Sequence, residues 1–117
     1  MTAGSVAGSP ASVAAAGDEL VGRLSDLAAA LREREAEIVQ ARIPGVPEAI
    51  TARVCTAVQR LRGEELYKLP GVGETIVWAQ ALMALGDEGD LEDTLGAALK
   101  VHEDVERVRE RKVLEGV

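Results

Sequence analysis

Aromatic residues, cysteine and histidine are scarce in this chain. Its 117 residues include one Trp, one Tyr and no Phe, with one Cys and one His. A single cysteine excludes an internal disulfide and a Cys-based metal cluster. One His and one Cys also make no convincing Ser–His–Asp or Cys–His catalytic set. His102 adjoins Glu103 and Asp104, but a helix does not present three consecutive side chains to one ion. We therefore predict no metal site and no catalytic residue.

Long apolar runs and early basic residues are missing as well. No apolar run approaches the roughly 18 residues that a helix needs to span a bilayer, and no Lys or Arg precedes Arg23. We therefore expect no membrane segment and no signal peptide. A lone cysteine is consistent with the reducing cytoplasm. The formal net charge is −7, which disfavours binding to a nucleic-acid backbone.

The residues that are plentiful favour helices. Hydrophobic residues make up 47% of the chain, so a core can form, and with so few aromatics it must consist of Ala, Val, Leu and Ile. Abundant Ala, Leu, Glu and Arg are typical of helical proteins, and no stretch alternates long enough to be a strand. We predict an all-α fold: a disordered Ala/Gly/Ser tail at 1–17, then a small bundle of about four helices over 18–117.

Caps and breakers divide this bundle. The expected helices span 18–42, 47–62, 74–85 and 90–112. Asp18 and Asp90 are the expected N-terminal caps, Pro47 suits a first helical turn, and Gly63 and Gly86 are the expected ends.

Four leucines recur along the first expected helix. Leu20, Leu24, Leu27 and Leu31 are spaced by four, three and four residues, which places them on one face as a heptad-like seam. Arg34 interrupts the seam and Ile38 resumes it. This leucine stripe either packs on its own domain or binds a protein partner, and a second copy of the chain is one such partner.

The segment Leu69-Pro70-Gly71-Val72-Gly73 resembles the hairpin of helix–hairpin–helix DNA-binding motifs. In those motifs, glycines let backbone N–H groups approach a phosphate at a helix N-terminus. Here Glu74 and Thr75 stand where a basic residue usually follows, and Glu74 would itself occupy the positive end of the helix. Nucleic-acid binding is therefore an alternative that this carboxylate and the net charge disfavour.

A second resemblance covers about two thirds of the chain, from Glu33 to Arg109. Four blocks carry it in order: EAEIVQARIPG at 35–45, LYK at 66–68, PGVGETIVWAQAL at 70–82, and TLGAALK at 94–100, followed by Glu103 and Asp104. Together they resemble the C-terminal helical lid of MoxR-type AAA+ ATPases, especially the actinobacterial type. Relatives usually have Ala where this chain has Gly73.

The resemblance implies a lid without its enzyme. In that family an α/β core precedes the lid and carries the phosphate loop, the Mg²⁺-holding acids and the arginine finger, and this sequence contains none of these motifs. We therefore expect a non-catalytic lid-like module without a cofactor, since ATP and Mg²⁺ belong to complete members. Those members act as chaperone-like ATPases, so the implied partner is an AAA+ core or a von Willebrand factor A domain protein. A truncated gene remnant is the other reading.

The lid motif predicts the residues of interest. They are Tyr67, Lys68, Pro70, Gly71, Gly73, Glu74 and Trp78. Glu74 matches a position where many AAA+ lids place an Arg that touches the nucleotide, so the resemblance does not extend to nucleotide sensing. We also expect Tyr67, Pro70 and Trp78 to form one structural unit, in which Trp78 covers the hairpin.

Overall fold

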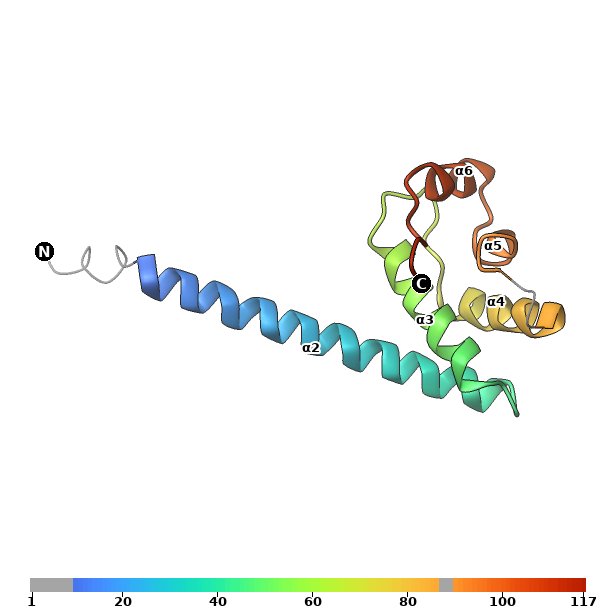
Figure 1. Ribbon diagram of the computed structural model, residues 1–117, viewed down its shortest axis with the longest axis horizontal. Helices are drawn as coiled ribbons and strands as arrows, with labels where there is room; N and C mark the ends of the chain where they lie inside the picture. The colour runs from blue at the N-terminus through green and yellow to red at the C-terminus, as the bar shows by residue number, and fades with distance from the viewer. Residues whose placement is uncertain (1–9, 87–89) are drawn as a thin grey trace, which may run out of the picture. The chain divides into compact units, whose positions relative to one another are not determined.

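The computed structural model describes residues 10–86 and 90–117, and within these ranges the chain forms helices, turns and irregular segments without a strand. The helices are α2 (Pro10–Arg42), α3 (Glu48–Arg62), α4 (Val72–Leu85), α5 (Leu95–Ala98) and α6 (His102–Glu110), labelled in Figure 1. The predicted all-α class is confirmed. In these ranges, every helix is too short or too polar to cross a membrane.

The chain divides into two compact units, Met1–Leu31 and Arg32–Val117. The described part of the first unit is helical and belongs to α2, whose last residues belong to the second unit. The expected helical domain at 18–117 therefore includes parts of both units.

Helix α2 begins at Pro10, earlier than the expected cap at Asp18, so Asp18 lies inside the helix. Residues 10–17, which we expected in the disordered tail, are helical. Pro10 suits a helix start, and the alanines that follow have the highest helix propensity. These preferences outweigh the low helix propensity of Gly17. The rest of the expected tail, residues 1–9, lies outside the described residues.

The core of the second unit is aliphatic apart from one indole. Helix α3 packs against α4, α4 against α5, and α5 against α6. The largest fully buried apolar side chains come from the end of α2, from α3, from α4 and from the C-terminal segments: Val39, Val54, Val58, Leu61, Trp78, Leu82, Leu95 and Val108. The predicted ends of the second and third helices are confirmed, because α3 and α4 stop at Gly63 and Gly86.

The prediction of one continuous helix over 90–112 is wrong. The chain forms a turn over 91–94, the short α5, an extended link at Leu99–Val101, and then α6. A straight helix over 90–112 would be about 33 Å long. The break allows Leu95, Leu99 and Val108 to be buried in one small core, and β-branched Val101 suits the extended backbone.

Candidate functional site

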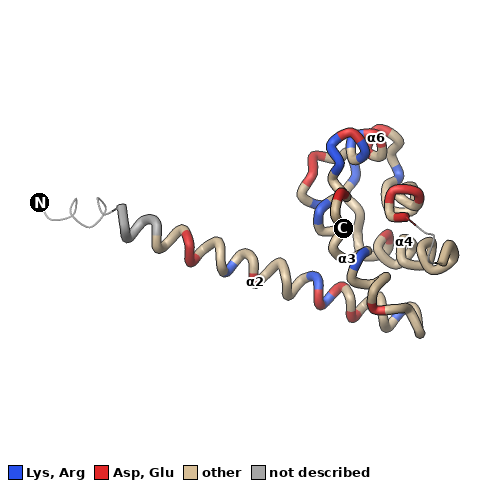
Figure 2. The backbone as a smooth tube through the Cα atoms, in the orientation of Figure 1, with Lys and Arg blue, Asp and Glu red and all other residues tan. Residues whose placement is uncertain are grey.

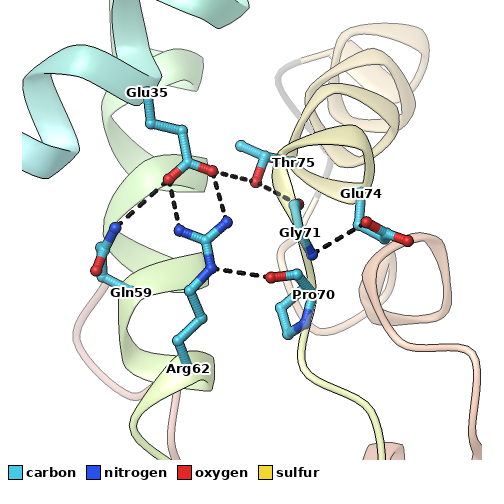
Figure 3. A network of polar contacts seen from close by, with 7 residues as sticks. All are labelled: Glu35, Gln59, Arg62, Pro70, Gly71, Glu74 and Thr75. Atoms are coloured by element: carbon cyan, nitrogen blue, oxygen red, sulfur yellow. Dashed lines mark hydrogen bonds and ion pairs between the residues drawn. The ribbon is translucent and has the colours of Figure 1, made fainter.

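A buried carboxylate connects three helices. Glu35 of α2 is only 4% exposed. Its two oxygens accept hydrogen bonds from the terminal nitrogens of Arg62 in α3, at 2.7 and 2.8 Å. The hydroxyl of Thr75 in α4 donates to the same carboxylate at 2.6 Å, and Gln59 donates a longer bond of 3.4 Å. Figure 3 shows these groups converging on Glu35.

Arg62 connects this network to the hairpin. Its Nε donates to the carbonyl oxygen of Pro70 at 2.9 Å (Figure 3), and Pro70 is buried. Arg62 therefore does not lie on a solvated face, because all three of its donor nitrogens have partners. The planar guanidinium forms a two-pronged pair with Glu35 and still has Nε free for the hairpin.

Glu35 is ionised at neutral pH. Burial acts to raise the pKa of this carboxyl, since it disfavours the charged form. Hydrogen bonds from Arg62, Thr75 and Gln59, with the positive charge of Arg62, outweigh that effect and leave the pKa below its usual value. The neighbouring Cys55 responds in the opposite way, because burial and the charge of Glu35 raise the pKa of its thiol to about 11. Its thiol is therefore protonated and unreactive.

The N-terminus of α4 is occupied by its own carboxylate. Helix α4 begins at Val72 rather than at Glu74, and the backbone N–H of Gly71 donates to Oε2 of Glu74 at 3.0 Å (Figure 3). Hydrogen bonds from the backbone N–H groups of Glu74 itself and of Gly71 lower the pKa of this carboxyl. The expected position of Glu74 at the positive helix end is confirmed. A phosphate at this hairpin would have to displace the carboxylate.

Trp78 is completely buried. Its indole Nε1 donates to the hydroxyl of Thr94 at 2.7 Å, and that hydroxyl lies 3.0 Å from the carbonyl oxygen of Asp90, to which it donates. Tyr67, which we expected in one unit with Pro70 and Trp78, is 84% exposed and does not belong to such a unit. The partner that fixes the indole lies instead in the turn before α5.

Asp104 holds the segment that leads into the hairpin. Its carboxylate, 1% exposed, accepts hydrogen bonds from the backbone N–H groups of Tyr67 and Lys68 at 2.8 and 3.0 Å. These two residues therefore contribute backbone contacts while their side chains are exposed. On the inner side of this helix Val105 packs against the core and Asp104 is buried, whereas His102 is exposed.

An open depression of about 640 Å³ lies beside this contact, and half of its lining residues are acidic. Glu65, Leu66, Tyr67, Glu103, Asp104 and Arg107 line it. Its three carboxylates are unsuited to a phosphate ligand. Within the described part of the chain, no group of His, Cys, Asp and Glu is placed to hold a metal ion.

The leucine stripe is exposed. Leu20, Leu24, Leu27 and Leu31 have 57%, 57%, 56% and 51% of their surface accessible. Farther along α2, Arg34 is exposed and its guanidinium lies 3.8 Å from Glu37, a weak pair between two exposed side chains. The stripe thus keeps the exposed apolar surface that binding to a partner requires.

Helix α4 has a second exposed apolar face, which the sequence interpretation missed. Gly73, Val77 and Ala84 recur at helical spacing and are exposed together with the uncharged polar Gln80, and Val77 has 44% of its surface accessible. Leu85 at the helix end is 52% exposed. Glu74 is the only charged residue in α4. A surface helix normally has a polar outer side, so this one is suited to contact another molecule.

No family model, curated protein or solved structure matches the chain. The likeness to the lid of MoxR-type ATPases therefore rests on the four sequence blocks alone and stays a prediction.

Proposed function

We propose that this chain is a non-catalytic helical module like the lid of MoxR-type AAA+ ATPases, and that it functions by binding another protein in the cytoplasm. The outer face of α4 carries the proposal. Val77 and Ala84 are exposed on a helix with one charged residue, and this helix lies within the longest block of the resemblance. In a complete ATPase, neighbouring parts of the machine would cover such a face. Here it is available to a partner.

Protein binding agrees better with the charges than nucleic-acid binding does. Figure 2 shows acidic and basic residues interspersed along α2 and around α6, without a long basic stretch in the described chain. Glu74 also occupies the backbone N–H that a phosphate would need. An AAA+ core or a von Willebrand factor A domain protein is the partner that the resemblance suggests.

We expect no ATP hydrolysis by the purified chain, because its sequence has no phosphate loop and no strand ending in Mg²⁺-binding acids. Phosphate release with ATP and Mg²⁺ should equal that of the buffer. Activity that co-purifies with the chain through repeated chromatography, and disappears in a variant of the chain, would contradict the non-catalytic assignment.

Changing Val77 and Ala84 together to Glu should weaken partner binding at least tenfold. The two carboxylates would place charge in the centre of the α4 face, where an interface has few charged residues. Both positions are exposed, so the fold should tolerate the change. Isothermal titration calorimetry would measure binding to the purified core of a MoxR-type ATPase and to a von Willebrand factor A domain protein, both from the same genome.

Ala41 and Ala49 provide the matched control. Both are exposed alanines outside α4, and changing both to Glu adds the same charge. This variant should bind like the unmodified chain. The proposal fails if neither partner binds, or if the α4 variant binds as tightly as the control.

A further inference from the structure

Two copies of the leucine stripe can match leucine with leucine either in one antiparallel register or in an in-register parallel pair. We infer that the stripe binds a second copy of this chain, with the two α2 helices antiparallel and Leu24 of one copy opposite Leu27 of the other. This interface differs from the α4 face, so it stands independently of the proposed function.

The leucines define the register. In a two-helix seam, positions spaced by three and four residues face the partner. With Leu24 opposite Leu27, Leu20 of one copy lies opposite Leu31 of the other, so four consecutive layers contain only leucine. A shift of one heptad sets Leu24 against Arg34 in one direction and Leu27 against Gly17 in the other. Among the antiparallel registers, only the one with Leu24 opposite Leu27 matches every leucine with a leucine.

Arg34 decides the direction. In a parallel pair it would lie opposite Arg34 of the other copy, so that two like charges share one layer, and two Gly17 residues would leave a gap. In the antiparallel register Arg34 lies opposite Gly17, which has no side chain to obstruct it. Asp18 follows Gly17 and is exposed, so the guanidinium has both space and an opposite charge. Each dimer contains this pairing twice.

The residues beside the seam permit close approach. Val21, Ala28 and Ala30 flank the leucines on α2, and Val21 is 62% exposed. Small and apolar flanks widen the apolar strip, and the charged neighbour Arg23 is already paired with Glu19 of its own helix at 2.6 Å. Exposed apolar patches of several hundred Å² are uncommon on monomers, which favours an occupied stripe.

Light scattering tests the self-association. The unmodified chain should have twice its monomer mass at micromolar concentrations. Changing Leu24 and Leu27 together to Glu should halve that mass, while the Arg32–Val117 unit still unfolds cooperatively in urea. The control changes Gly22 and Ser25 to Glu, two exposed positions outside the stripe, and should remain dimeric. A monomeric unmodified chain would overturn the inference and leave the α4 proposal unaffected.

Spin labels test the direction. Ser25→Cys and Glu33→Cys would be labelled separately in a Cys55→Ala background and measured by double electron–electron resonance. In the antiparallel register the two labels at position 25 are offset by about 1.5 Å along the axis, and those at position 33 by about 22 Å. The distance at position 33 should therefore be clearly longer. Similar distances at both positions would indicate a parallel pair and overturn the inference.

A charge exchange tests the contact itself. Arg34→Glu should raise the dimer dissociation constant roughly 2- to 30-fold, since two partly exposed ion pairs are lost. Adding Asp18→Arg should restore most of the affinity. In a parallel pair the second substitution would restore nothing, so a failed rescue would contradict the pairing of Arg34 with Asp18.

Discussion

Replacing Trp78 by alanine should lower the free energy of unfolding of the Arg32–Val117 unit by roughly 3–5 kcal/mol. The indole is the largest side chain in a core whose other members are aliphatic residues and Cys55, and it is completely buried. Its removal would leave a cavity that valines and leucines cannot fill, and would deprive the buried Thr94 hydroxyl of the indole donor. This loss is a large fraction of a small domain's stability.

Urea unfolding followed by circular dichroism would measure the change. Trp78→Phe is the matched control, because it keeps an aromatic ring and removes the hydrogen bond to Thr94. It should cost less, on the order of 1–2 kcal/mol. A loss below about 1 kcal/mol for Trp78→Ala would show that the indole contributes little to the core.

Local signals in the sequence predicted the helices well and their interruptions poorly. Gly63 and Gly86 end α3 and α4 as expected, since a glycine is readily accommodated where a helix stops. The break between α5 and α6 has no such residue. The break is explained by tertiary contacts. Leu99 is buried in the core, and Asp104 in α6 binds the segment that leads into the hairpin. Such contacts join distant parts of the chain, and local propensity does not contain them.

The polar network was missed for a related reason. Glu35 shares a face with Val39 and Ile43, four and eight residues later, and both of these are buried. That spacing was a usable signal. The partners Arg62 and Thr75 lie 27 and 40 residues away, so the sequence alone did not indicate which charge would balance a buried carboxylate.

The two exposed apolar surfaces also differ in how well the sequence predicted them. The spacing of Leu20, Leu24, Leu27 and Leu31 predicted a helix with an apolar seam, and the seam is present and exposed. The outer face of α4 was not predicted, because its apolar residues occur all around the helix and periodicity could not distinguish a buried helix from one with a free side. Only the packing of Trp78 and Leu82 into the core identifies Val77 as the outward residue.

Replacing Glu35 by alanine should destabilise the same unit by about 3 kcal/mol, near the lower end of the cost of breaking a buried ion pair. The substitution leaves Arg62 without its two-pronged partner and removes the acceptor of Thr75. The Arg62 side chain is 26% exposed, so it recovers some hydration, which is why we expect the lower end. Glu33→Ala is the control, since Glu33 is exposed and its loss should change stability by less than about 0.5 kcal/mol.

The pH dependence of the Glu35 contribution distinguishes a charged network from simple packing. The pKa of Glu35 is lower in the folded chain than its ordinary value of 4.5, so the folded state binds a proton less readily than the unfolded state. The stabilisation is therefore complete above about pH 4.5 and is lost as the pH falls through the folded pKa. Urea unfolding of the unmodified chain and of Glu35→Gln, repeated from neutral to acidic pH, should show their difference shrinking on the acidic side. A difference that stays constant across this range would mean that Glu35 stabilises the fold through its shape and hydrogen bonds without its charge.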